Sequence, residues 1–79
     1  MDLLSRPAER ALADGMRAYD EAHYAQAEIH LRRALATGLN HPRDRATAHK
    51  LLAFIACASE RLNECTNEFQ SARRADPGF

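Results

Sequence analysis

The stretch ATAHKLLAFIACASERLNECTNEFQSARRADPGF, residues 46–79, decides the fold, because the first half of the chain is a degenerate copy of it. When the sequence is aligned with itself at an offset of 38 residues, small side chains match small ones and bulky side chains match bulky ones. The matched pairs are Gly15 and Ala53, Ala18 and Ala56, Tyr24 and Leu62, Ala27 and Cys65, Leu31 and Phe69, and Ala34 and Ala72. A recurring unit of two helices and a turn is the signature of a helical repeat. We therefore predict an all-α fold of two antiparallel helix hairpins.

Apolar and small residues recur at intervals of three and four, which predicts helices rather than strands. We expect a first helix that is capped by Ser5, carries Pro7 in its first turn and runs to Asp20. We expect further helices over Tyr24–Thr37 and Leu62–Ala75, and one that opens at Arg43 or Asp44. The proposed organisation is an N-terminal extension over 1–5, a first repeat over 6–38, a linker over 39–45 and a second repeat over 46–79.

Gly15 lies inside the first predicted helix, where glycine costs about 1 kcal/mol relative to alanine. We expect this cost to be offset by close approach of the second helix, with Ala27 against Gly15. Several residues of the second helix are expected to point inward: Tyr24, Ala27, Leu31, Ala34 and Leu35.

The bulk composition excludes several classes of protein. Apolar content of 46% with 28% charged residues is typical of a globular chain, so general disorder is not expected. Eleven basic residues balance eleven acidic ones, which argues against nucleic acid as a partner. No apolar run approaches the roughly 20 residues that span a bilayer, so we expect no membrane insertion. The first ten residues lack the pattern of a signal peptide, although an exported origin stays open.

The sequence contains no pattern that predicts catalysis, a metal or a cofactor. The four histidines form neither an HExxH motif nor a set of four ligands with the two cysteines. His49 is instead expected to pack at a seam between helices. No serine or threonine has a recognisable base nearby in sequence. An enzyme, a metal site and a DNA-binding helix-turn-helix are therefore the weaker alternatives.

Charged residues form two groups in the sequence. Glu60, Glu64 and Glu68 are spaced four apart, which predicts a solvated helix face. A basic group surrounds the linker and could form a rim for acidic peptides or serve solubility alone; its members are Arg32, Arg33, Arg43, Arg45 and Lys50.

Cys57 and Cys65 lie four residues on either side of Arg61, where the turn of the second hairpin is expected. Residues equidistant from such a turn face each other, and Cα atoms at the 4.4 to 6.8 Å of a disulfide are plausible. We favour a disulfide. The alternative is two buried free thiols, as expected in the cytosol.

The chain resembles the tetratricopeptide repeat (TPR) family. The resemblance is carried in the first unit by Gly15, Tyr24, Ala27, Leu31, Ala34 and Leu35, and in the second by Leu52, Ala53, Ala56, Leu62, Cys65, Phe69, Ala72 and Pro77. It implies that the two hairpins stack as a short right-handed α-solenoid. It also implies a non-catalytic module that binds a peptide or protein segment in a concave groove formed by the first helix of each repeat. The implied groove residues are Leu12, Met16, Tyr19, Asp20, Thr47, Lys50, Leu51 and Phe54. Leu51 could equally belong to the core.

The asparagines of the carboxylate clamp found in chaperone-binding TPR modules are replaced here by Met16 and Phe54, so recognition of apolar side chains is expected. A weaker resemblance to bacterial envelope-associated TPR proteins slightly favours the periplasm or cell envelope over the cytoplasm.

Two repeats are fewer than the three that such arrays normally need, which predicts an uncovered apolar patch. We expect Ile55, Phe69 and Phe79 in this patch. The two explanations are that the chain is a fragment of a longer TPR protein or that it forms a homodimer. An oligomerising or structural role is accordingly the main alternative to peptide binding.

Overall fold

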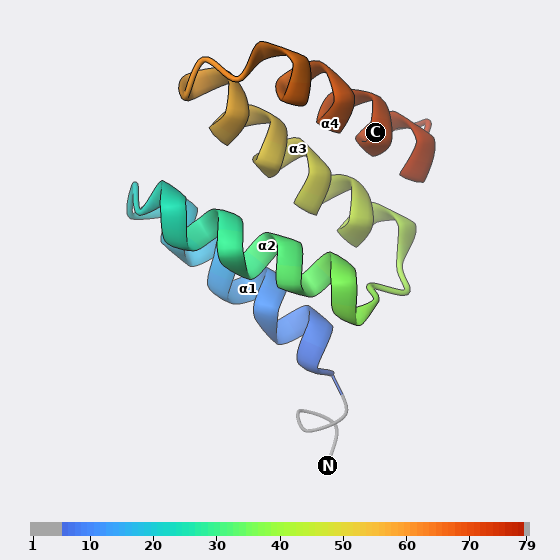
Figure 1. The fold of residues 1–79 in the computed structure, drawn as a ribbon. Coiled ribbons are helices and arrows are strands. Elements are labelled where there is room, and N and C mark those ends of the chain that lie inside the picture. Colours follow the sequence, from blue (N-terminus) through green and yellow to red (C-terminus); the bar gives the residue numbers. More distant parts are fainter. Residues whose placement is uncertain (1–5, 79) are drawn as a thin grey trace.

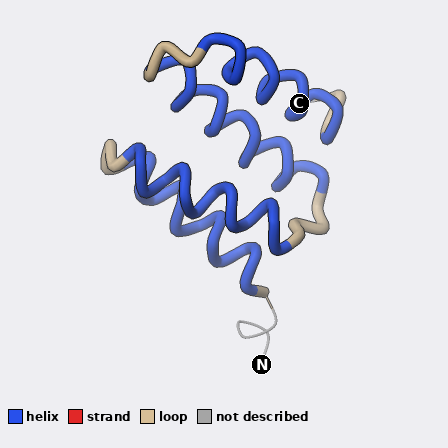
Figure 2. Tube along the Cα trace, in the orientation of Figure 1, coloured by secondary structure: helices blue, strands red, loops and turns tan. Residues whose placement is uncertain are grey.

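The computed structural model describes residues 6–78, which form four α-helices and no strand. The helices are α1 (Pro7–Asp20), α2 (Tyr24–Thr37), α3 (Pro42–Ala58) and α4 (Leu62–Ala75). Figure 1 shows two hairpins, α1 with α2 and α3 with α4, with α2 and α3 adjacent where the hairpins meet. Loops form the short connections between helices and the two ends of the described chain (Figure 2). The predicted all-α fold of helix hairpins is confirmed. The extension over 1–5 and Phe79 lie outside the described residues.

The two hairpin turns have the same backbone structure, 38 residues apart. Ala22 and Glu60 both adopt positive φ, at 64° and 63°. The amide of His23 donates to the carbonyl of Ala18, and that of Arg61 donates to the carbonyl of Ala56, each at 2.8 Å. Helices commonly end at a residue in the left-handed backbone conformation, and the amide after it then donates to a carbonyl of the last helical turn. The repeat seen in the sequence is therefore also a repeat of the backbone.

The predicted bounds of α2 and α4 and the predicted end of α1 are confirmed, but α3 begins earlier than the predicted Arg43 or Asp44. Arg6 occupies the cap position of α1, and the predicted cap, Ser5, lies outside the described residues. His41 caps this helix, because its Nδ1 accepts a hydrogen bond from the amide of Arg43 at 3.2 Å. Pro42 follows at the first helical position, where its missing N–H is not needed. The second half of the predicted linker, from Pro42 on, is thus helical.

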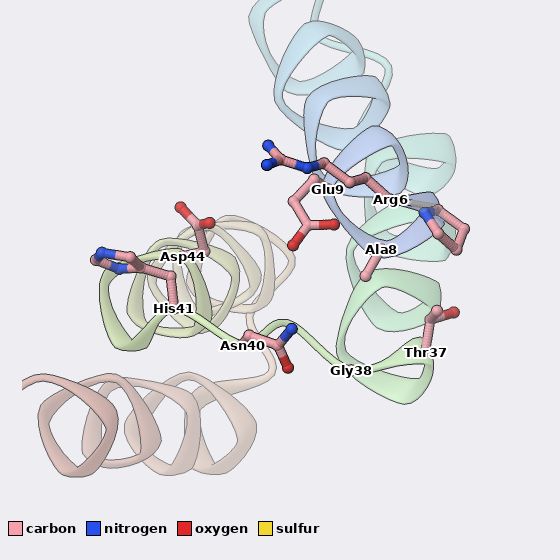
Figure 3. Close-up of a pocket in the computed structure, with 9 residues that line it drawn as sticks. Arg6, Ala8, Glu9, Thr37, Gly38, Asn40, His41 and Asp44 are labelled. Atoms are coloured by element: carbon pink, nitrogen blue, oxygen red, sulfur yellow. The ribbon is translucent and has the colours of Figure 1, made fainter. Parts of the chain in front are cut away.

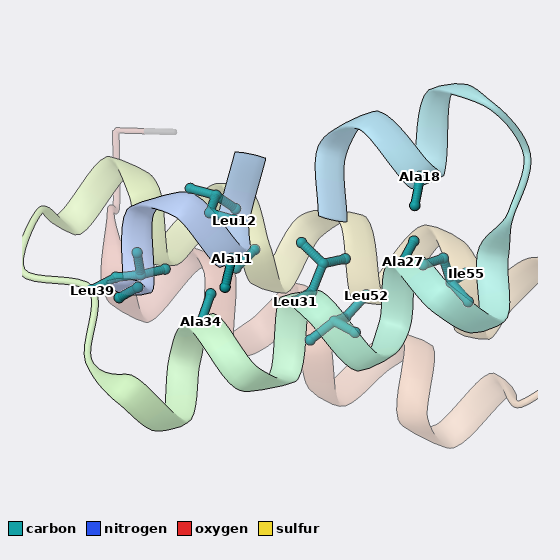
Figure 4. Packing of buried hydrophobic residues seen from close by; sticks show 11 residues of the cluster. Ala11, Leu12, Ala18, Ala27, Leu31, Ala34, Leu39, Leu52 and Ile55 are labelled. Carbon is teal, nitrogen blue, oxygen red and sulfur yellow. The ribbon is translucent and has the colours of Figure 1, made fainter. Parts of the chain in front are cut away.

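The main core lies between α1, α2 and α3 and is built from small and medium side chains (Figure 4). Leu31 of α2 and Leu52 of α3 are its largest fully buried members. A smaller cluster of Ala53, Ala56 and Cys65 joins α3 to α4. Ile55 belongs to the main core at 2% exposure, so the expectation that it lies in an uncovered patch was wrong.

Gly15 allows α1 and α2 to approach closely, but its neighbour differs from the predicted Ala27. A Cβ atom built on Gly15 would lie 2.8 Å from both Cγ and Cδ2 of Leu31 and 3.3 Å from Cβ of His30. Leu31 is fully buried, and side chains in a close-packed core have little room to move. The close approach is therefore made to a leucine side chain.

The side chains of α2 confirm the predicted inward face except at its start. Ala27, Leu31 and Ala34 are buried, and Leu35 packs against the core. Tyr24 is 42% exposed, so its predicted inward position was wrong. Its ring packs beside that of Tyr19, with 5.4 Å between the ring centroids, next to the turn of the first hairpin.

Candidate functional site

A shallow hollow lies between the first helices of the two hairpins, α1 and α3. Its volume is about 290 Å³, and it is lined by Met16, Tyr19, Asp20, Thr47, Lys50 and Leu51. Met16 is exposed, whereas Tyr19 and Leu51 are half-buried, so the apolar side chains form a floor that solvent still reaches. Asp20 and Lys50 add one charge of each sign. The structure thus brings together six of the eight residues implied for the groove.

The other two residues implied for the groove, Leu12 and Phe54, lie outside this hollow. Leu12 is 6% exposed and belongs to the main core. Phe54 lies further along α3, is 37% exposed and packs edge-on against Phe69 of α4, with 5.5 Å between the ring centroids. Nζ of Lys50 lies 5.9 Å from the centre of the Phe54 ring, which is within cation–π range. Lys50 therefore links the hollow to the aromatic pair.

A network of ion pairs connects α2 to the second hairpin, contrary to the prediction of a solvated acidic face on α4. Arg61 donates to both carboxylate oxygens of Glu28 at 3.1 Å and to Glu64 at 2.9 Å. Arg32 pairs with Glu28 and Glu64 and lies 3.7 Å from Glu68. The side chains of Glu28, Glu64 and Glu68 are 15 to 30% exposed, so this network is partly shielded from water.

His49 occupies the predicted seam position and has a partner that sequence spacing did not indicate. Its Nδ1 lies 2.7 Å from Oε1 of Glu68, across the seam between α3 and α4. Glu60, the first member of the predicted acidic row, instead lies in the turn before α4. Spacing in the sequence shows only the pairs within one helix. Glu28 and Arg32 are four residues apart and can form an ion pair on α2, and Glu64 and Glu68 place two carboxylates on one face of α4.

The Arg61 guanidinium, which donates hydrogen bonds to Glu28, holds the pKa of that carboxyl below its usual range, and Arg32 adds to this effect, while partial burial opposes it. A lowered pKa in the folded state means that ionised Glu28 stabilises the fold above about pH 4.3, the ordinary glutamate value. We expect that contribution to disappear as the pH falls through the lower folded pKa. Urea unfolding of wild type and Glu28→Gln between pH 7 and pH 3 measures the contribution of ionised Glu28 to the free energy of unfolding. The stability difference should be largest at neutral pH and shrink in acid; a difference that stays constant with pH would contradict this assignment.

A cavity of about 680 Å³ lies beside the linker (Figure 3). Glu9 of α1, Asn40 of the linker and Asp44 of α3 surround it, together with backbone around Gly38. Arg45 holds the linker in place, because its guanidinium donates to the carbonyls of Leu39 and Asn40 at 2.9 and 3.0 Å. Arg45 is therefore engaged with the backbone and is not part of an open basic rim. The cavity combines carboxylates, an amide and an imidazole without a nucleophile hydrogen-bonded to a base.

Cys57 of α3 and Cys65 of α4 are joined by a disulfide, with 5.1 Å between their Cα atoms. This pairing confirms the predicted link across the second hairpin. Cys65 is buried, whereas Cys57 is exposed. The bond closes a loop that contains the turn and Arg61, which places it next to the ion-pair network.

Within residues 6–78, no three His, Cys, Asp or Glu side chains come together in a way that could hold a metal ion. Over the same residues, no helix combines the length and apolar character needed to cross a membrane. Comparisons with protein families, with curated proteins and with solved structures found no significant match.

Proposed function

We propose that this chain is a non-catalytic interaction module of the TPR type that holds a peptide or protein segment in the hollow between α1 and α3. The observation that carries the proposal is the open floor of Met16, Tyr19 and Leu51, contributed by matching helices of two repeated hairpins. Concave, mostly apolar surfaces with a few polar groups are typical binding sites. Asp20 and Lys50 at this floor would orient a bound chain by charge.

Phe54 extends the apolar surface beyond the hollow, which suits a segment that presents several apolar side chains in succession. Met16 supports tolerance for different partners, because a thioether side chain adapts its shape to what it contacts. The disulfide supports residence in an oxidising compartment such as the periplasm, since such bonds persist there and are rare in the cytosol.

Selection of peptides from a displayed random library against the oxidised protein tests the proposal. We expect selected peptides to carry apolar residues and to lose about tenfold or more in affinity for Met16→Ser, since few contacts dominate such interfaces. Ile29→Ser is the matched control, because Ile29 is 57% exposed on α2 and does not line the hollow. Equal loss for both variants, or selected peptides insensitive to Met16→Ser, would overturn the proposal.

A further inference from the structure

The second hairpin carries a surface that corresponds to the α3-binding surface of the first hairpin. In the first hairpin, Leu12, Leu31, Ala34 and Leu35 pack in the core cluster that also contains Ala48, Leu52 and Ile55 of α3. The residues 38 positions later are Lys50, Phe69, Ala72 and Arg73. These four residues line an open hollow of about 440 Å³. We call it the α3/α4 seat.

We propose that the α3/α4 seat binds an amphipathic helix of a partner protein, with an apolar stripe like that of α3 and acidic residues beside the stripe. Phe69 is 38% exposed at this seat and offers an aromatic anchor, whereas its counterpart Leu31 is fully buried in the main core. Lys50 and Arg73 replace Leu12 and Leu35, so the seat keeps an apolar centre and gains two cations at its edge. A helix with carboxylates at its margins complements that pattern.

A second copy of this chain, stacked head to tail, fits the seat poorly. The residues of α3 that face the first hairpin are Ala48, Leu51, Leu52 and Ile55, and their counterparts on α1 are Arg10, Ala13, Asp14 and Arg17. All four of these α1 residues are exposed, and Asp14 already pairs with Arg17 at 3.7 Å. Docking this face would bury two arginines beside Lys50 and Arg73 without an apolar stripe. The charge pattern therefore favours an acidic partner over self-association.

This site differs from the hollow proposed for peptide binding, although Lys50 borders both. The probes are two fluorescein-labelled synthetic helices that share the apolar spacing of residues 48–55 and carry either glutamate or lysine at every flanking position. In fluorescence anisotropy titrations with the oxidised protein, we expect the glutamate helix to bind about tenfold or more tightly than the lysine helix. Phe69→Ser should weaken binding of the glutamate helix by a similar factor, while Met16→Ser should leave binding of that helix unchanged.

Arg73→Glu is a second variant that tests the seat even if Phe69→Ser does not fold. Arg73 is exposed, and its substitution leaves the apolar centre of the seat intact. This variant should reduce or invert the preference for the glutamate helix. Equal binding of both helices, a preference that Arg73→Glu does not change, or loss of binding in Met16→Ser but not in Phe69→Ser would overturn the proposal. Sedimentation velocity gives a further test, since a dimer abolished by Phe69→Ser would make a second copy the occupant and contradict it.

Discussion

Leu31→Ala is expected to lower the free energy of unfolding by about 3 to 5 kcal/mol, because it removes a fully buried leucine from the centre of a small core. Total stabilities of about 0.05 to 0.15 kcal/mol per residue make this a large fraction of what a 79-residue chain can have. Urea unfolding followed by circular dichroism, with the disulfide intact, measures the loss. The conservative variant Leu31→Met should cost less than about 1.5 kcal/mol and reports on the same site if the alanine variant does not fold.

The contact between Gly15 and Leu31 predicts that the effect of Gly15→Ala on stability changes sign when Leu31 is replaced by alanine. In the wild-type background, Gly15→Ala should destabilise by about 1 to 3 kcal/mol, because the added methyl group would lie 2.8 Å from two atoms of Leu31. In the Leu31→Ala background, the same change should stabilise by about 1 kcal/mol, the ordinary helix preference of alanine over glycine. Ala13→Gly, at an exposed position of the same helix, calibrates that preference. Stabilisation by Gly15→Ala in the wild type would show that the two helices have room at this point.

The sequence predicted the helices because their ends carry strong local signals. The same type of turn precedes α2 and α4 and sets where each begins. Gly38 marks the end of α2, and Asp76-Pro77 marks the end of α4. The start of α3 was placed too late, because the His41 cap depends on a side chain folding back on the amide of Arg43. The exposure of Tyr24 was also missed, since a tyrosine beside another ring can satisfy the pattern of an inward residue while remaining solvated.

The candidate site was only partly predictable, because spacing identifies a helix face but not its depth. Met16, Tyr19 and Leu51 line the hollow as expected, whereas Leu12 on the same face of α1 is covered by the core. The ion-pair network could not be derived from spacing, since Glu28 and Arg61 meet only when the hairpins stack. Pairs within one helix are visible in sequence; pairs between helices need the angle and separation of the helices.

Reduction of the Cys57–Cys65 disulfide is expected to lower the free energy of unfolding by about 2.5 kcal/mol. The bond joins residues that are eight positions apart, and the loop it closes restricts the unfolded chain. Exposure of Cys57 gives a dithiol reductant access without global unfolding. Urea unfolding with and without dithiothreitol measures the effect, and a thiol assay verifies the release of two thiols. The double variant Cys57→Ala and Cys65→Ala is the control that should not respond to reductant. Unchanged stability after complete reduction would contradict the expected contribution.

The disulfide should also strengthen the contact between the hairpins, because Arg61 lies inside the loop that it closes. Arg61 donates to Glu28 on α2 and Glu64 on α4, so its position depends on the turn that the cysteines fix. Reduction frees that turn, and holding Arg61 against Glu28 then costs more conformational entropy. Glu28→Gln is therefore expected to destabilise the oxidised protein more than the reduced one at pH 7. A double-mutant cycle between Glu28→Gln and the cysteine double variant gives this coupling directly. A coupling free energy of zero would mean that disulfide and ion pairs stabilise the fold independently, and that the second hairpin holds Arg61 in place without its covalent link.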